Sequence, residues 1–263
     1  IGGVSCDRDI TEFVKIVDLL NKTKLNLEVL EQEVSKLGES RFSFDHIIGN
    51  NFEFKEIVNF CKKISKSNIN VLITGESGTG KEVFARAIHI DSGRKGRFIP
   101  INCSAIPEDL MESELFGYEG GAFTGALKKG KIGKFELAHE GTLFLDEIGD
   151  MPVHMRPKIL RVLEDGEICR IGSENSMKVD VRVIAATNKD LKQMVYEGKF
   201  RKDLYYRLNS ILIKLPPLRE RRDDIPELVN KFIEYFCTTY RTNIPEIPKE
   251  IMNILVNYDW EGN

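Results

Sequence analysis

The spacing of apolar residues changes twice along this chain, and each spacing predicts a different kind of structure. Between Phe13 and Leu37 the apolar residues recur at alternating intervals of three and four, with Thr23 at the one weak position and charged residues in between. Such a stripe keeps one face of a helix against a partner helix. It predicts a dimeric coiled coil over residues 13–40. The alternative is a single amphipathic helix packed on its own domain.

Short runs of apolar and β-branched residues follow a linker that ends at Gly49, and segments with helical spacing, such as Val153–Glu164, separate them. Strands that alternate with helices are typical of a parallel sheet covered on both faces. We therefore expect an α/β domain with a five-stranded parallel sheet over residues 41–216. The five predicted strands are Asn70–Thr74, Phe98–Asn102, Thr142–Asp146, Val179–Thr187 and Ser210–Leu215.

Only helical spacing remains after Pro216 and Pro217, in the segments Ile225–Tyr240 and Lys249–Asn257. This change predicts a smaller helical subdomain over residues 217–263. Because the chain starts without Met and stops abruptly at Asn263, we expect it to be a piece of a longer protein with an incomplete helical subdomain.

The composition is that of a globular protein: 263 residues, 30% of them charged, with a formal net charge of −3. This charge gives no general electrostatic reason to coat a polyanion. The cysteines are scattered and none are spaced as CxxC, which argues against a disulfide framework or a zinc site and fits a reducing cytosol. No apolar run approaches the roughly 20 residues that span a bilayer. We expect a cytoplasmic protein without a membrane partner.

A glycine-rich segment directly follows the first predicted strand. Its G-x-x-x-x-G-K spacing is that of a loop that binds phosphates between a strand and a helix. Its backbone amides would turn towards the phosphates, the helix N-terminus adds a positive dipole end, and Lys81 reaches the outer phosphates. The alternative is a turn with a structural role only. The predicted nucleotide-binding residues here are Gly75, Glu76, Ser77, Gly78, Thr79, Gly80, Lys81 and Glu82.

Two carboxylates, Asp146 and Glu147, end the third predicted strand, at the sheet edge where ligands of open α/β sheets bind. Neighbouring strand residues point to opposite sides, so we predict that Asp146 holds Mg²⁺ and that Glu147 acts as general base on the attacking water. Glu82 replaces the usual Ser or Thr metal ligand, which leaves Thr79 or water for that position. The alternative is a pair of solvated turn residues. With the phosphate loop, the pair predicts nucleoside triphosphate hydrolysis.

The string GAFTGA lies between these two motifs. A lone aromatic residue among Gly and Ala has little apolar company, so a mobile surface loop that presents Phe123 to a partner is the interpretation we favour. A simple glycine-rich turn is the alternative. The basic residues Lys128, Lys129 and Lys131 follow and could touch DNA, although short basic runs are more often solvated. The predicted partner-binding residues are Gly121, Ala122, Phe123, Thr124, Gly125 and Ala126.

Several longer strings accompany GAFTGA in a fixed order: GESGTGKE, FELAHEGTLFLDEIGDMP, AATNKDL, FRKDLYYRLN and LPPLRERRDDI. With them, the chain from about residue 44 to its end resembles the nitrogen-regulator-like, sigma-54-dependent transcription activators, a branch of the AAA+ ATPases. Glu82 after the lysine is also usual in that family. The resemblance implies an α/β AAA+ P-loop ATPase with a C-terminal helical lid, which is truncated here, and with ATP and Mg²⁺ as cofactors.

For catalysis, the resemblance implies that Asn102 holds Glu147 in an inactive orientation and releases it as the GAFTGA loop rises. The plainer interpretation of Asn102 is hydrogen bonding to backbone at a strand end. Asn188 would be a polar sensor near the γ-phosphate with Thr187 beside it, and a helix N-cap is its plainer alternative. Further implied roles are adenine binding by Ile48 and Gly49, and arginine fingers that reach the neighbouring subunit, Arg201 and Arg207.

For partners, the resemblance implies that Phe123 and Thr124 engage sigma-54 when ATP is bound, so that a hexameric or heptameric ring remodels the closed complex of sigma-54 RNA polymerase. Promoter or enhancer DNA would be bound mainly through a helix-turn-helix after the C-terminus. Residues 1–12 resemble the end of a PAS sensor domain, whose signal the coiled coil would carry. A generic AAA+ DNA motor or clamp loader is the alternative, because it shares the phosphate loop and the carboxylate pair.

Overall fold

The computed structural model describes residues 42–124 and 126–263. The predicted PAS-like segment, the predicted coiled coil and Gly125 lie outside these residues. Residues 43–263 form one unit, and its structure is considered by itself.

All five predicted strands are present and form one parallel sheet in the order β2-β5-β8-β1-β9. The boundaries differ from the prediction mainly at the fourth strand, which begins at Arg182 rather than at Val179. Val179 instead donates its N–H to the carbonyl of Gly166, in a neighbouring hairpin, at 2.8 Å. The strands are β1 (Val71–Thr74), β2 (Phe98–Asn102), β5 (Thr142–Asp146), β8 (Arg182–Thr187) and β9 (Ile211–Lys214).

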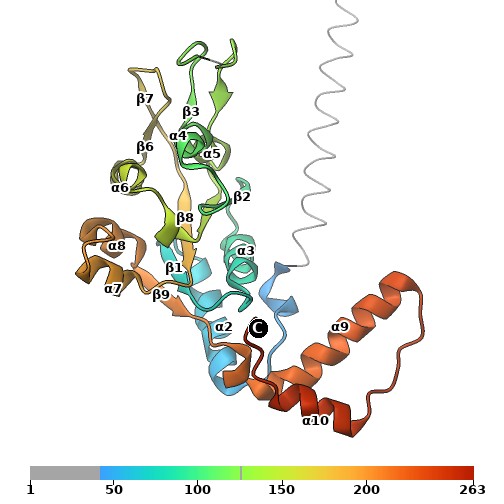
Figure 1. Ribbon diagram of the computed structural model, residues 1–263. Coiled ribbons are helices and arrows are strands. Elements are labelled where there is room, and N and C mark those ends of the chain that lie inside the picture. The colour runs from blue at the N-terminus through green and yellow to red at the C-terminus, as the bar shows by residue number, and fades with distance from the viewer. Residues whose placement is uncertain (1–41, 125) are drawn as a thin grey trace, which may run out of the picture. The chain divides into compact units, whose positions relative to one another are not determined.

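Helices cover both faces of the sheet, as the alternation of strands and helices predicts (Figure 1). Within β1 and β5, successive side chains enter opposite hydrophobic clusters: Ile73 and Phe144 join one, whereas Leu72 and Leu145 join the other. The helices of the α/β part are α2 (Phe52–Ser65), α3 (Lys81–Ser92), α4 (Glu108–Phe116), α5 (Lys134–Leu137), α6 (Arg156–Asp165), α7 (Leu191–Tyr196) and α8 (Lys202–Leu208).

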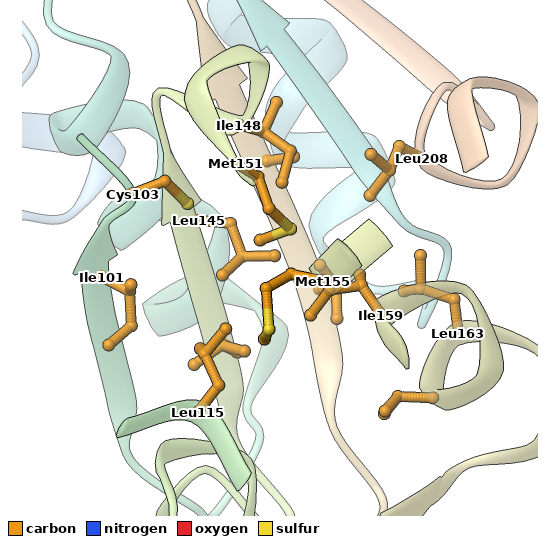
Figure 2. Close-up of a cluster of buried hydrophobic side chains, with 14 of the residues drawn as sticks. Ile101, Cys103, Leu115, Leu145, Ile148, Met151, Met155, Ile159, Leu163 and Leu208 are labelled. Atoms are coloured by element: carbon orange, nitrogen blue, oxygen red, sulfur yellow. The ribbon is translucent and has the colours of Figure 1, made fainter. Parts of the chain in front are cut away.

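The second cluster is drawn in Figure 2, where Leu145 of β5 lies beside Met151, Met155 and Ile159. The predicted helix Val153–Glu164 divides here into a 3₁₀ turn at Val153–Met155 and helix α6. This packing fixes the segment that leaves β5, and therefore also the carboxylates at its end.

Two small antiparallel hairpins, which the sequence pattern did not predict, extend from the α/β layer. One pairs β3 (Gly117–Tyr118) with β4 (Lys131–Ile132), and the other pairs β6 (Glu167–Cys169) with β7 (Ser176–Lys178). They lie together on the side of the sheet away from α9 and α10 (Figure 1), and a bridge between Tyr118 and Ile171 joins them. Strands of two or three residues are too short to show an alternating pattern.

The helices after the sheet are α9 (Ile225–Tyr240) and α10 (Lys249–Asn257), with the bounds that the spacing predicts. The 3₁₀ turns Leu218–Glu220 and Arg222–Asp224 connect β9 to α9. In the part of the chain that the structure describes, no helix combines the length and the apolar character needed to cross a membrane.

Candidate nucleotide site and partner loop

The phosphate loop joins β1 to α3. Gly78 and Gly80 have φ values of 81° and 95°, a region that favours glycine and turns the backbone into a tight loop at the start of α3. Lys81 is buried, and its Nζ donates to the carbonyls of Gly75 and Glu76, each at 3.0 Å. These carbonyls therefore hold the Lys81 side chain against the loop that is predicted to bind the phosphates.

Thr79 lies inside the loop rather than at its mouth. Its hydroxyl is buried and donates to the carbonyl of Glu76 at 2.8 Å. Of the two alternatives for the extra metal ligand, this geometry favours water over Thr79. Glu82 points away into an ion pair with Arg86, one turn further along α3, at 2.7 Å.

The two carboxylates diverge at the end of β5. Asp146 accepts the backbone N–H of Glu147 at 3.0 Å, whereas Oε2 of Glu147 accepts the N–H of Asn188 at 3.4 Å. Glu147 has a φ of 49°, a left-handed conformation that is uncommon for a side-chain-bearing residue and that turns the chain into the Ile148–Asp150 turn. The ion pair between Lys189 and Asp150 joins the same two segments.

The carboxylates also make this strand end strongly negative. Cys103 is buried beside them, and its backbone N–H donates to the carbonyl of Asp146 at 2.9 Å. Burial first, and then the charges of Asp146, Asp150 and Glu147, raise the pKa of Cys103 to about 12. Such a site favours a bound cation.

Asn102 lies next to this group, in register with Asp146 across β2 and β5. Its Oδ1 accepts hydrogen bonds from the backbone and hydroxyl of Ser104, at 2.9 and 2.7 Å, and from the N–H of Ala105 at 3.3 Å. These contacts agree with the alternative interpretation of Asn102, in which its side chain bonds to backbone groups in the turn after β2. The register nevertheless leaves Asn102 one strand away from the Glu147 that it is predicted to control.

Thr187 and Asn188 end β8 beside the phosphate loop, and the carbonyl of Thr187 accepts the N–H of Gly75 at 3.3 Å. The buried hydroxyl of Thr187 accepts the N–H of Lys189 at 3.0 Å. The alternative role of Asn188 as a helix N-cap is wrong, because α7 begins at Leu191 and Asp190 accepts the N–H of Gln193 as its cap.

The two predicted arginine fingers lie at the start and near the end of one short helix, α8. Arg201 precedes α8 and forms an exposed ion pair with Asp203 at 2.7 Å. Arg207, near the end of α8, donates from Nε and Nη2 to the carbonyl of Leu163 at 2.9 and 2.7 Å. An open depression of about 560 Å³ lies over Arg201 and Tyr206. A second cleft of about 430 Å³ touches the phosphate loop at Gly75, and neither arginine lines it.

Gly49, in the predicted adenine-binding segment, is closely covered. A Cβ there would approach the ring of Phe54 to 2.3 Å and Oδ2 of Asp224 to 3.1 Å. Asp224 is fully buried, and its Oδ1 accepts the N–H of Asn51 at 2.7 Å. Arg221 stacks over Phe54 at 4.2 Å. The sequence pattern did not predict these contacts of Arg221 and Asp224, although both residues belong to the string LPPLRERRDDI.

Phe123, Thr124 and the other described residues of GAFTGA lie in the loop between β3 and β4 (Figure 1). Phe123 is 45% exposed, and its ring packs edge-on against Tyr118 at a centroid distance of 5.0 Å. Thr124 is exposed, and the two limbs of the hairpin are so close that a Cβ on Gly120 would lie 2.2 Å from the carbonyl of Lys128. The phenylalanine therefore has one aromatic neighbour and a solvent-facing side.

Arg170 supports this hairpin from the neighbouring one. Its guanidinium pairs with Glu136 of α5 at 2.7 Å and with Glu119 at 3.3 Å. These two carboxylates raise the pKa of Arg170 above its ordinary value, and the largest cause is the hydrogen bonding of its guanidinium to Glu136. The loop base is thus held while its tip is exposed.

A five-stranded parallel sheet with a phosphate loop after β1, a carboxylate pair after β5 and C-terminal lid helices defines the class: this is an AAA+ fold of the P-loop ATPase type. Sequence comparison identifies the branch. The family described as "Sigma-54 interaction domain" matches residues 47–214, and the "AAA+ ATPase lid domain" matches residues 219–263. The chain belongs to the family of sigma-54-dependent, NtrC-like transcription regulators.

Individual relatives agree with this assignment. A signal-transduction and transcriptional-control protein of Clostridium beijerinckii is 54% identical over 85% of this chain and 36% of its own length. The regulatory protein AtoC of Escherichia coli is 48% identical over 94% of this chain and 54% of its own length. The crystal structure of NtrX from Brucella abortus in complex with ATP has a TM-score of 0.79 and 36% identity, and the match covers 95% of this chain and 53% of that one. The chain thus spans about a third to a half of these proteins.

Proposed function

We propose that this chain hydrolyses ATP within a ring of identical subunits and uses that energy, through the GAFTGA loop, to remodel closed complexes of sigma-54 RNA polymerase. The observation that carries the proposal is the position of the loop. An exposed Phe123 and Thr124 lie at the tip of a hairpin that is held at its base, in the same domain as a phosphate loop and a carboxylate pair.

Catalysis in this proposal depends on residues at three strand ends. Gly75–Lys81 after β1 would bind the phosphates, Glu147 after β5 would orient and deprotonate the attacking water, and Asn188 after β8 would contact the γ-phosphate. The N–H of Asn188 already bonds Glu147, so these two residues lie within reach of one small ligand. Asn102, one strand away, would act on Glu147 only after leaving its contacts with Ser104.

The residues at this strand end fit a magnesium ion. Magnesium in nucleotide sites is commonly held by one or two carboxylates together with phosphate oxygens, so Asp146 at this negative strand end would suffice. Bound there, the ion would offset charge on the β- and γ-phosphates.

The positions of two arginines support the proposed ring. Arg201, just before α8, and Arg207, within α8, are both exposed, and neither contributes to the cleft beside the phosphate loop. We infer that they act on the nucleotide of the neighbouring subunit in a hexamer or heptamer, as arginine fingers do. Such a ring would complete each active site only at a subunit interface.

Other parts of the proposal concern the longer protein. We propose that residues 1–12 end a PAS-like sensor, that residues 13–40 form a dimeric coiled coil that carries its signal, and that residues 41–216 and 217–263 are the α/β and lid subdomains of the ATPase. A helix-turn-helix beyond residue 263 would bind promoter or enhancer DNA, and the whole would act in the cytoplasm.

The test measures binding of the chain to sigma-54 with ATP and a transition-state mimic of the γ-phosphate. We expect Thr124→Ala and Phe123→Ala to weaken the trapped complex at least about tenfold, as loss of a central contact does, while ATP hydrolysis continues. Phe60→Ala is the matched control, because Phe60 on α2 is exposed to 46%, like Phe123 at 45%.

A second function, a generic AAA+ motor, predicts a different result. If the chain hydrolyses ATP but neither it nor any variant binds sigma-54, the GAFTGA proposal is wrong and the generic motor is preferred. Equal loss in Phe60→Ala would show that the binding defect is not specific to the loop.

A further inference from the structure

The side chain of Glu76 makes contacts that phosphate binding by backbone amides does not require. Glu76 is the second residue of the phosphate loop, and its carboxylate forms a two-pronged pair with Arg219: Oε1 to Nη2 at 2.5 Å and Oε2 to Nη1 at 2.8 Å. Arg219 lies in the turn Leu218–Glu220, at the point where the sheet ends and the lid begins. One loop side chain thus holds the start of the lid.

The same carboxylate also reaches the residues after α10. Nδ2 of Asn263 lies 3.4 Å from Oε2 of Glu76 and 3.0 Å from the carbonyl of Ser77, to both of which it donates. Oδ1 of Asn263 accepts the N–H of Leu218 at 2.6 Å. A Cβ on Gly78 would lie 2.2 Å from the carbonyl of Gly262, so the two backbones are in direct contact.

The ion pair between Glu76 and Arg219 also affects the charge of the phosphate loop. The hydrogen bond from Arg219, aided by Asn263 and opposed by partial burial, lowers the pKa of Glu76 to about 2, so the carboxylate stays ionised at neutral pH. A negative charge on a phosphate-binding loop repels phosphates unless it is neutralised. A two-pronged guanidinium partner is the strongest neutralisation that a side chain offers a carboxylate.

We propose that Glu76 is a positioning residue: through Arg219 and Asn263 it holds the start of the lid and the segment after α10 on the phosphate loop, while Arg219 cancels its charge for the incoming phosphates. Nucleotide binding and lid position then become one event, because the loop cannot rearrange around phosphates without moving residues 218–219 and 262–263. This inference rests on the proposed nucleotide binding and adds a role for the Glu76 side chain.

The test uses the full-length protein and the variants Glu76→Gln, Arg219→Gln and their double variant. Without nucleotide, both single variants should raise amide hydrogen exchange in residues 217–220 and 258–263 by about two- to fivefold, within the range of a lost exposed ion pair, while exchange in the sheet stays unchanged. Glu56→Gln, on the exposed side of α2, is the control and should change neither region.

The second measurement is the Kd for ATP and its dependence on salt. Arg219→Gln leaves Glu76 without its partner and should weaken ATP binding about tenfold, most at low salt. The double variant removes the charge and should recover most of that affinity, although its lid still exchanges fast. This recovery separates a charge effect from general damage to the fold.

Two results would overturn the inference. If the double variant binds ATP as poorly as Arg219→Gln, then Arg219 contacts the phosphates itself and Glu76 is not its target. If neither single variant changes exchange in residues 217–220 or 258–263, the contacts do not hold these segments of the lid. If instead exchange rises as expected and the unmodified chain binds no ATP, the positioning role stands and the proposed function fails.

Discussion

At the scale of single residues, backbone and partner together orient Glu147, the proposed general base. Its φ of 49° turns the chain away from β5, and its carboxylate meets the N–H of Asn188, on the segment after β8, at 3.4 Å. The Lys189–Asp150 ion pair binds these two segments together nearby. A side chain fixed in this way loses little conformational freedom when it receives a water molecule.

We predict that Glu147→Gln lowers the rate of ATP hydrolysis about 10²- to 10³-fold, the usual contribution of a general base, and changes the Kd for ATP by less than about twofold. The amide keeps the shape and the contact with Asn188 but does not accept the proton. Phosphate release and equilibrium nucleotide binding measure the two quantities. Glu164→Gln, an exposed glutamate on α6, is the control. A parallel loss of binding and hydrolysis would indicate that Glu147 is structural.

At the scale of elements, the β3–β4 hairpin depends on glycines at its crossing points. Gly130 has a φ of 71°, and a Cβ there would lie 2.5 Å from the carbonyl of Tyr118. Gly198 has almost the same φ, 70°, but a Cβ there would meet nothing within 4 Å. The two positions therefore share a backbone cost and differ only in the clash.

We predict that Gly130→Ala distorts the hairpin and weakens sigma-54 binding about tenfold, with ATP binding unchanged. Gly198→Ala should cost only the left-handed backbone strain, about 1–2 kcal/mol of stability, without an effect on sigma-54. Amide exchange over residues 117–132 and the sigma-54 binding assay measure the difference. If both variants bind sigma-54 normally, the hairpin geometry is not needed for the loop's role.

A buried arginine joins α2 to the sheet. Arg182, at the start of β8, is 1% exposed and donates to the carbonyls of Ser65, Ile64 and Ile69. Burial and the nearby charge of Arg94 lower the pKa of Arg182 to about 10. The guanidinium satisfies the carbonyl end of α2, where helix carbonyls have no partner within the helix.

We predict that Arg182→Met lowers the free energy of unfolding by about 3 kcal/mol, because buried carbonyls lose their donor. Denaturant unfolding measures the change. Arg161→Met, at a side chain that is 62% exposed, should change it by less than about 0.5 kcal/mol. An equal effect of the two substitutions would mean that the carbonyls find water instead.

At the scale of the whole molecule, the proposed arginine fingers would make ATP hydrolysis depend on pairs of neighbouring subunits. If Glu147 acts within its own subunit and Arg201 acts on the neighbour, Glu147→Gln and Arg201→Ala should each be inactive alone. Mixed in equal amounts, they should regain about a quarter of the normal ATPase rate, since one random pairing in four joins an intact Glu147 to an intact Arg201. No recovery on mixing would contradict action between subunits.

The sequence by itself determined the elements and the family. The five strands and both lid helices appear where apolar spacing predicts them, because a strand buried on both faces and an amphipathic helix each impose a spacing that local sequence carries. The phosphate loop and the carboxylate pair were also predictable from the sequence, since each is a short contiguous motif placed at a strand end. The family followed from ordered strings, which need no geometry.

Only the tertiary structure decided which distant residues meet. Arg219 and Asn263 reach Glu76 across 143 and 187 positions of sequence, and Asp224 reaches Asn51 across 173, distances over which no periodicity extends. The tertiary structure likewise gave the N-cap of α7 to Asp190 rather than Asn188, and it formed the hairpin that carries Phe123 from strands of two residues. The local spacing of apolar residues shows which face of an element is buried. Side-chain pairs between distant elements depend instead on how those elements pack together in the tertiary structure.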